Sequence, residues 1–299
     1  MSYSSLSCQR FEFGGFSRSE HARYSVIGVP YDFTSTYRPG SRFGPNAIRE
    51  ASINLEAYCL RNMFDVEDVP IEDLGDLNVL TDAGATTDLL QKVVAEVVSE
   101  NKFPIVLGGE HTITYGSVRA FDETALISFD AHLDLRDEYL GNKLSHAAFM
   151  HRLCEFLGPE RIFEIGSRAV CPEELNFAKE TGVKYLTSRD VLKIGVTGVL
   201  SKLRDWASSF DRIYVTVDMD FLDPSYAPGV GNPVPEGLSP TMLLDMLQRI
   251  CGPKVVGLDV VEVSPSYDSG LTAIQAANIV YNVIAFQEAR QDSTKQERY

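Results

Sequence analysis

Short runs of apolar and β-branched residues recur along the chain, and a polar loop and a stretch of helical periodicity follow most of them. Most runs are continuously apolar rather than alternating, which is typical of strands in a parallel sheet with helices on both faces. The predicted strands are Tyr24–Val29, Val69–Glu72, Ile105–Leu107, Leu126–Phe129, Ile162–Ile165, Val183–Leu186, Ile213–Val217 and Val255–Val260. The predicted helices include Thr86–Ser99, Ser145–Leu157, Glu173–Thr181, Pro240–Cys251 and Gly270–Ala289.

This alternation of strands and helices extends over the whole chain and predicts one fold class. It is typical of a single three-layer α/β/α domain, residues 1–299, around a mostly parallel sheet of about eight strands. The sequence contains no low-complexity linker, internal repeat or shift in composition that would mark a domain boundary. We expect residues 1–20 and the polar stretch 291–299 to be loose ends.

The balance of charge excludes several classes of partner. The chain contains 27 Lys and Arg against 42 Asp and Glu, which gives a formal net charge of −15. Nucleic acid and anionic lipid both require a basic surface, so we expect neither as a partner. Five scattered cysteines without CxxC spacing indicate reduced thiols. The sequence shows neither a signal-peptide pattern nor an apolar run long enough to span a membrane, and it predicts a cytoplasmic protein.

Binding sites of open α/β sheets lie just beyond the carboxyl ends of the strands, and four predicted strands here run into acidic or histidine residues. The first ends in Gly-Gly-Glu-His, which places His111 at the sheet edge. The second is followed by Asp130, His132 and Asp134, whose spacing puts all three on one face of an extended segment. His111 alone suits a structural hydrogen bond and the second group a surface turn, but two facing carboxylates beside an imidazole favour a bound cation.

Two further strand ends carry carboxylates. Asp218 and Asp220 follow an apolar strand with the same spacing of two, which suits either a divalent cation or an N-cap with a turn residue. Glu262 follows another apolar strand. It suits either a solvated position beyond the sheet rim or an anchor for a cation in the crevice. Taken singly, these residues leave both pairs of alternatives open.

Together these side chains are far more specific than any of them alone. Three strand ends supply six potential ligands: His111, Asp130, His132, Asp134, Asp218 and Asp220. Six protein ligands with two bridging carboxylates suit a pair of divalent cations about 3.5–4 Å apart. Oxygen-rich ligands with some imidazole and no thiolate favour Mn²⁺ over zinc. We therefore predict two Mn²⁺ ions per chain.

The motifs GGEH, DAHLD, SHAAF, DMDFLDP and DVVEVSP occur in this order and resemble those of the ureohydrolase family, which includes arginases and agmatinases. The stretch from Arg38 to Arg49 is similar to the family's early GxRxGPxxIR segment. The resemblance extends from about Ser25 to Ala285. It implies an arginase-like fold, a homo-oligomer (a trimer or a hexamer) and a small cationic guanidino substrate that is hydrolysed to urea and an amine.

The resemblance also implies roles for individual residues. One Mn²⁺ would bind His111, Asp130, Asp134 and Asp218, and the other His132, Asp130, Asp218 and Asp220, with Asp130 and Asp218 bridging. A metal-bridging hydroxide would attack the guanidinium carbon. Asp134 would pass a proton to the leaving nitrogen, Glu262 would pair with the guanidinium, and His146 would shuttle protons.

The segment after DAHLD is expected to contact the tail of the substrate. Its Asp-Glu-Tyr sequence resembles that of agmatinases, and acidic residues suit the free amine of agmatine, so the predicted products are putrescine and urea. Arg136 is discordant, because it would favour a carboxylate tail such as that of guanidinobutyrate if it pointed into the pocket. If it pointed outward or paired with Asp137 or Glu138, it would be neutral evidence. The alternatives are arginine or another guanidino compound, an amide or formimino substrate, and an inactive homologue that binds polyamine-pathway ligands.

Several positions near the predicted site differ from the residues that are common in the family. They are Glu110 for Asp, Ala147 for Gly with Ala148 after it, Asn232 for Thr, and Glu236 for Gly. Two histidines, His21 and His151, match no family motif, and we assign them no role. We expect His151 on the exposed face of its helix.

Overall fold

The predicted α/β fold is confirmed by a computed structural model, which describes residues 11–15 and 21–296. One sheet has eight strands, all paired in parallel, in the order β4-β1-β5-β10-β9-β6-β7-β8. Its strands are β1 (Tyr24–Val29), β4 (Ile71–Asp76), β5 (Phe103–Gly108), β6 (Thr124–Phe129), β7 (Ile162–Ser167), β8 (Lys184–Thr187), β9 (Arg212–Asp218) and β10 (Val255–Val261). A separate hairpin pairs β2 (Tyr58–Cys59) with β3 (Phe64–Asp65).

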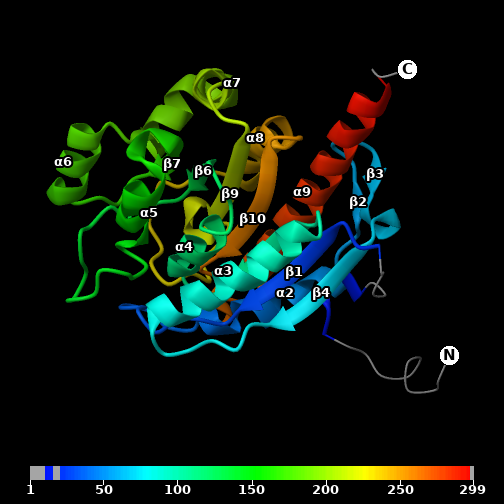
Figure 1. The fold of residues 1–299 in the computed structure, drawn as a ribbon, viewed down its shortest axis with the longest axis horizontal. Coiled ribbons are helices and arrows are strands. Elements are labelled where there is room, and N and C mark those ends of the chain that lie inside the picture. The colour runs from blue at the N-terminus through cyan, green and yellow to red at the C-terminus, as the bar shows by residue number, and fades with distance from the viewer. Residues whose placement is uncertain (1–10, 16–20, 297–299) are drawn as a thin grey trace.

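Helices cover both faces of this sheet (Figure 1), which explains why its strands are apolar along their whole length. One apolar core lies between the sheet and α2 (Gly44–Ile53), α7 (Ser188–Ala207), α8 (Pro240–Ile250) and α9 (Leu271–Gln296). The other core lies between the sheet and α3 (Ala83–Ser99), α4 (Thr114–Val118), α5 (Phe149–Leu157) and α6 (Pro172–Thr181). Side chains on alternate positions of each strand therefore pack into different cores.

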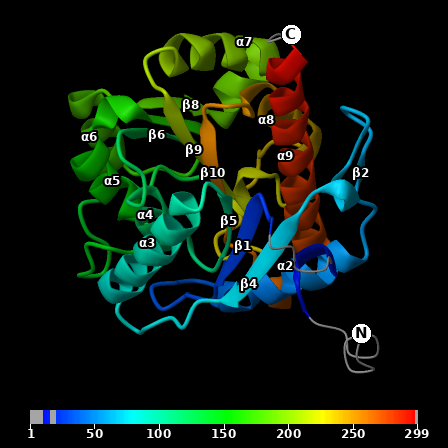
Figure 2. The same cartoon turned by 45° about the vertical axis from the view of Figure 1, so that its right-hand side comes forward.

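The order of the strands creates a reversal at the centre of the sheet. The chain adds β4 and β5 on the two sides of β1, builds β6, β7 and β8 further along, and then returns to insert β9 and β10 between β5 and β6. Figure 2 shows these central strands lying side by side. In open α/β sheets the crevice beyond the carboxyl ends at such a reversal is the usual binding site.

The observed elements differ from the predicted ones mainly at their ends. The helix expected from Ser145 begins at Phe149, because residues 145–148 form a turn in which the Ser145 carbonyl accepts the backbone N–H groups of Ala148 and Phe149. Helix α9 continues past the predicted end at Ala289, as far as Gln296. Of the predicted loose ends, residues 1–10, 16–20 and 297–299 lie outside the described residues.

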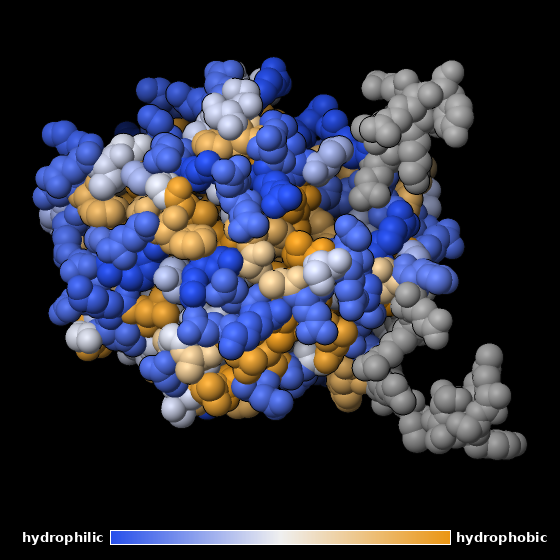
Figure 3. All heavy atoms as spheres, viewed as in Figure 1, coloured by the Kyte–Doolittle hydropathy of each residue, from blue (hydrophilic) through white to orange (hydrophobic). Residues whose placement is uncertain are grey.

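The surface offers no sign of a membrane-spanning element in the described part of the chain. No helix there combines the length and the apolarity needed to cross a bilayer. The face shown in Figure 3 mixes polar and apolar side chains, and polar groups interrupt the apolar ones.

Candidate active site

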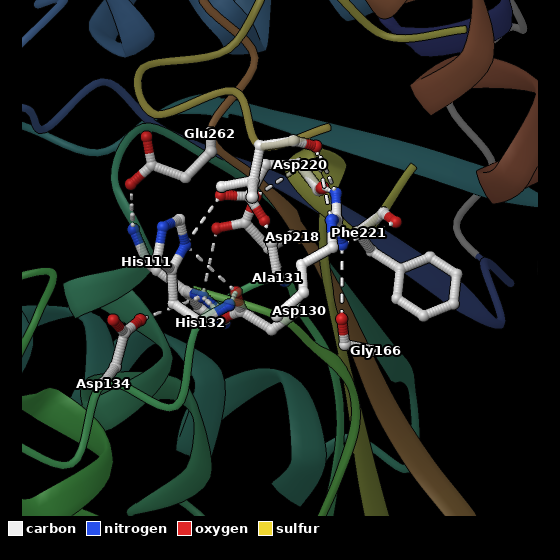
Figure 4. Close-up of polar contacts among 12 residues, drawn as sticks. His111, Asp130, Ala131, His132, Asp134, Gly166, Asp218, Asp220, Phe221 and Glu262 are labelled. Carbon is white, nitrogen blue, oxygen red and sulfur yellow. Dashed lines mark hydrogen bonds and ion pairs between the residues drawn. The ribbon is translucent and has the colours of Figure 1, made fainter. Parts of the chain in front are cut away.

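The predicted ligand groups lie at the carboxyl ends of four adjacent strands, β5, β10, β9 and β6. His111 follows β5, Asp130 follows β6, Asp218 ends β9 and Glu262 follows β10. Figure 4 shows these side chains turned toward one another at one place beyond the sheet. The topology thus brings together residues that are up to 151 positions apart, such as His111 and Glu262.

His111 presents one ring nitrogen to a group of carboxylates. Its Nδ1 atom lies 2.8 Å from Asp130 Oδ2, 3.3 Å from Asp218 Oδ2 and 3.8 Å from Asp134 Oδ2. The ring is buried and packs against Phe149, with centroids 4.4 Å apart. Burial opposes a charged ring, but the close approach of the Asp130 carboxylate outweighs burial and raises the pKa of His111 to about 9.

A buried polar network holds the other ring nitrogen of His111. Its Nε2 atom lies 2.8 Å from the hydroxyl of Thr216, in β9. That hydroxyl is 3.4 Å from Thr114 Oγ1, which in turn donates a hydrogen bond of 2.9 Å to Asp259. Burial raises the pKa of Asp259 to about 6. Partners of this kind fix the orientation of a metal-binding imidazole, here with Nδ1 toward the carboxylates.

The segment after β6 does not continue as an extended strand, as the spacing of its residues had suggested. The N–H of Asp130 still donates to the Ile165 carbonyl at 3.0 Å, and the N–H of His132 then turns back to Asp130 Oδ1 at 2.7 Å. Asp134 has a positive φ of 51°, in the left-handed region that favours glycine. This turn, and not a shared strand face, directs Asp134 toward the same cluster. Such strained backbones often occur at functional sites.

The end of β9 forms the N-cap and turn that the sequence offered as one alternative, and its carboxylates also face the ligand cluster. Asp218 caps the short turn after β9, because its Oδ1 accepts the N–H of Asp220 at 2.7 Å. Asp220 Oδ2 lies 2.9 Å from His132 Nδ1. Burial and the charge of Asp220 raise the pKa of Asp218 well above its usual range. The two aspartates are therefore turn residues that also face the cluster.

Arg168, which the sequence reasoning missed, holds this turn in place. It lies just after β7, and its guanidinium donates only to backbone carbonyls among the described residues. The nearest of these carbonyls belong to Asp220 at 2.6 Å, Val234 at 2.9 Å, Pro235 at 3.1 Å and Gly166 at 3.2 Å. Burial lowers its pKa. Arg168 is half-buried and has no carboxylate partner within ion-pair distance among the residues that the structure describes, which only the structure reveals.

Two groups of ligand atoms are compact enough to hold a metal ion. They are His111, Asp130 and Asp134, and Asp130, His132 and Asp220, with all ligand atoms of a group within 4.8 Å of one another. His111 Nδ1 and Asp130 Oδ2 are close, yet neither is aligned for a hydrogen bond. Burial and neighbouring carboxylates raise the pKa of Asp134 and of Asp218. Unsatisfied buried donor atoms and crowded negative charge fit a pair of divalent cations that share Asp130.

Glu262 faces the crevice and is not a solvated rim residue. Its Oε1 atom accepts the N–H of His111 at 2.9 Å, and its own N–H donates to the Gly109 carbonyl at 2.8 Å. Its φ of 66° lies in the left-handed region. Burial, followed by the charge of Glu110, raises the pKa of Glu262 to about 8. The strand end therefore directs a buried carboxyl group toward the metal-ligand cluster.

A cavity of about 370 Å³ opens beside this cluster and contains the predicted shuttle. His146 lines the cavity from the turn before α5, and its side chain is buried. Its Nδ1 atom lies 3.3 Å from Thr34 Oγ1, and its ring packs edge-on against Tyr139 at 5.7 Å. Burial and the charge of His132 lower the pKa of His146 to about 4. The ring is therefore neutral at neutral pH.

Arg136 also lines the cavity, which settles the orientation that the sequence left open. Its guanidinium lies over the ring of Tyr139, 5.1 Å from the centroid. Within the described residues it forms no ion pair, and Asp137 instead pairs with Arg152 at 2.5 Å. Arg136 thus brings a positive charge to the pocket wall.

The remaining sequence expectations have mixed outcomes. The expectation for His151 is wrong, because its ring is only 13% exposed and stacks on Phe177 at 4.0 Å. Ala147 and Asn232 line the cavity. Glu236 adopts a positive φ of 63°, which a glycine would adopt without strain.

Comparison with known proteins identifies the family. A family model described as the arginase family matches residues 22–285. The chain belongs to the arginase family. This family member is 44% identical to an uncharacterized 32.2 kDa protein of Methanothermus fervidus over 264 residues, which is 87% of this chain and 90% of the relative. It is 38% identical to the agmatinase of Bacillus cereus, over 89% and 92% of the two chains.

Solved structures agree with this assignment. The crystal structure of agmatine ureohydrolase from Thermoplasma volcanium superimposes with a TM-score of 0.92 at 38% sequence identity, covering 98% of this chain and 99% of the other. The arginase-like fold and the ureohydrolase resemblance are thereby confirmed. The role of each site residue in this arginase-family member stays a prediction.

Proposed function

We propose that this protein hydrolyses agmatine to putrescine and urea with two bound Mn²⁺ ions. The supporting observation is the group of four buried carboxylates, the buried His111 and the half-buried His132, beside a cavity that Glu262 and His146 also line. Two divalent cations held by these ligands would lower the pKa of a shared water and supply the nucleophile. Similarity to proteins named agmatinase and agmatine ureohydrolase supports the choice of substrate.

Glu262 is suited to bind the guanidinium group. Its Oε1 atom is occupied by the N–H of His111, which leaves Oε2 for a substrate N–H. In the metal-free protein burial raises its pKa to about 8, so that the carboxyl group is largely protonated at neutral pH. An arriving guanidinium would favour the charged form, so that substrate binding and loss of this proton are coupled.

Asp134 and His146 are suited to move protons. The Asp134 carboxyl group lies beside the cluster and can pass a proton to the leaving nitrogen. His146 is neutral and borders the cavity, so its ring can exchange a proton between the amine product and solvent. General acid–base groups of this kind contribute about 10²–10⁴-fold to a rate.

A second candidate substrate is a guanidino acid such as guanidinobutyrate. The specific observation in its favour is that Arg136 lines the cavity without a carboxylate partner among the described residues. Its guanidinium would pair with a carboxylate tail and repel the amine of agmatine. Acidic groups such as Glu174, which also lines the cavity, oppose this effect.

Urea release from Mn²⁺-loaded protein tests both candidates. We would measure kcat/KM for agmatine, arginine, guanidinobutyrate and guanidinopropionate, and count metal ions per chain. The agmatine proposal expects agmatine as the best substrate and little change in Arg136→Gln. The guanidino-acid alternative expects a preference for guanidinobutyrate that Arg136→Gln abolishes. Absence of urea with every substrate would refute the ureohydrolase proposal altogether.

His146→Ala gives a sharper test of the assigned roles. The variant should bind Mn²⁺ as the wild type does and lose about 10²–10⁴-fold in kcat. Asp130→Asn should instead lose metal and activity together, because Asp130 belongs to both groups of ligand atoms. Equal metal loss in the two variants would contradict the proposal that Asp130 binds the metal ions and that His146 only moves protons.

A further inference from the structure

The loop after β1 is tied tightly to the end of β5. The N–H of Glu110 donates to the Tyr31 carbonyl at 2.8 Å. At Gly109 a Cβ atom would lie only 1.9 Å from that same carbonyl oxygen, so the close approach of the two backbones requires glycine there. This contact fixes Thr34, three residues further along the loop, above the side chain of Glu110.

Thr34 joins Glu110 to His146 through a complete set of hydrogen bonds. Its N–H donates to Glu110 Oε2 at 2.9 Å, and its hydroxyl donates to Glu110 Oε1. The same hydroxyl oxygen accepts the backbone N–H of His146 at 3.0 Å and lies 3.3 Å from His146 Nδ1. Thr112 adds a further donor to Glu110 at 2.6 Å. In its ionised form Glu110, with these donors around its carboxylate, acts as the acceptor of this group.

Because the Thr34 hydroxyl has a single proton, its hydrogen bonds determine which ring nitrogen of His146 carries a proton. A hydroxyl has one proton and two lone pairs, and the proton of Thr34 goes to Glu110. Both lone pairs then remain as acceptors, one for the backbone N–H of His146 and one for its ring. The ring can fill the second only if Nδ1 carries a proton.

We propose that Thr34 is a positioning residue that holds neutral His146 in the tautomer with the proton on Nδ1 and the lone pair on Nε2. This inference rests on the proposed function, in which the imidazole moves protons at the cavity. Nε2 has no hydrogen-bond partner among the described residues, and Tyr139 packs against the ring. Thr34, in the loop after β1, thus leaves Nε2 as the single basic ring atom of His146 that faces the cavity.

Thr34→Val removes the hydroxyl while it keeps the branched shape, and Thr34→Ser is the matched control that keeps the hydroxyl. For the Mn²⁺-loaded protein we expect Thr34→Val to lower kcat roughly 10-fold or more, within the range set by loss of a general acid–base group. KM and metal content should not change, and Thr34→Ser should retain wild-type kcat. A Thr34→Val variant with wild-type kcat, or one that changes only KM or metal content, would overturn the proposal.

A double-mutant cycle separates positioning from a general structural effect. If Thr34 acts through His146, then Thr34→Val should have no further effect on kcat in the His146→Ala background. An equal fractional loss in both backgrounds would show that Thr34 acts by another route and would overturn the proposal.

Nitrogen NMR reads the tautomer without any enzymatic assay. In [¹⁵N]histidine-labelled protein loaded with diamagnetic Zn²⁺, the His146 signals, assigned by their loss in His146→Ala, should report a proton on Nδ1. Thr34→Val should introduce the Nε2-protonated form, and Thr34→Ser should not. A wild-type ring protonated on Nε2 would overturn the proposal. Failure of the proposed function would show separately, as absence of urea from every substrate while these NMR signals remain as expected.

Discussion

The described residues include a neutralised group of carboxylates, Asp73 and Asp76 around Arg49, and an unneutralised group at the ends of β6 and β9 that has no arginine or lysine partner there. Asp73, in β4, accepts two hydrogen bonds from the buried Arg49, at 2.7 and 2.9 Å, and Asp76 accepts a third from the same guanidinium. At the ends of β6 and β9, by contrast, the charged or titratable side chains nearest to Asp130 and Asp218 among the described residues are imidazoles and other carboxylates. A buried acid with its own arginine is a structural element. A buried group of acids and imidazoles without one is suited to bind cations.

Asp218→Asn should produce the largest effect. The substitution removes a predicted metal ligand from the unneutralised group. Loss of a residue that only hydrogen-bonds to a ligand lowers metal affinity by up to about 100-fold, so the loss of Mn²⁺ affinity in this variant should be larger. Urea release should fall to background. Because repulsion and burial already raise the pKa of Asp218, the metal-free variant should be at least as stable as the metal-free wild type. Metal analysis and thermal unfolding in EDTA check the two parts, and a strongly destabilised variant would contradict the comparison.

Asp73→Asn is the matched substitution in the neutralised group. It leaves the charge of Arg49 buried without its bidentate partner, which costs about 3–5 kcal/mol in the free energy of unfolding. Metal content and kcat of the folded protein should not change, because Asp73 lies in the other group. Urea denaturation measures the first effect and metal analysis the second. Loss of metal in this variant would show that the two groups are not independent.

Thr216→Val should have a smaller effect on the same site. The hydroxyl of Thr216 holds Nε2 of His111, so its loss frees the ring to turn its Nδ1 atom away from the carboxylates. A residue that hydrogen-bonds to a metal ligand typically contributes roughly 10–100-fold to metal affinity. Titration with Mn²⁺ measures the change, and Thr216→Ser serves as the control. If both variants bind metal like the wild type, then the position of His111 does not depend on this hydrogen bond.

The sequence was sufficient for the fold and for the membership of the candidate site. Strand β1 begins and ends at the predicted residues, and the carboxylates and imidazoles at the strand ends lie together as expected. Both results depend on local rules, since continuous apolar runs indicate buried parallel strands and parallel strands bring their carboxyl ends to one edge.

Tertiary contacts decide what the sequence left open. Asp134 reaches the cluster through a left-handed backbone that its spacing did not indicate. Arg168 acts through carbonyls of segments more than 50 residues away, and no motif marks such contacts. His151 is covered by Phe177 of the following helix, so its place on its own helix said little about its exposure.

The dependence of stability on pH should show the smallest effect, and it tests the unneutralised group as a whole. In the metal-free protein, burial raises the pKa of Glu110 to about 7 and of Glu262 to about 8, and Asp130 raises that of His111 to about 9 despite its burial. Each pKa lies above its unfolded value, so the folded state holds more protons between pH 6.5 and 9. Stability therefore falls as pH rises through this window.

No such dependence would be expected over this range if an arginine held these acids ionised, because a group that is ionised in both the folded and the unfolded state contributes no change with pH. Calorimetry in EDTA at pH 6.5, 7.5 and 8.5 should show Tm decreasing by roughly a few degrees. Saturating Mn²⁺ should reduce this decrease, because a bound cation takes the place of the proton on His111 and offsets the repulsion among the carboxylates. A metal-free Tm that does not fall over the same range would mean that the cluster already contains its counter-charge, and the distinction between the two groups of acids would be lost.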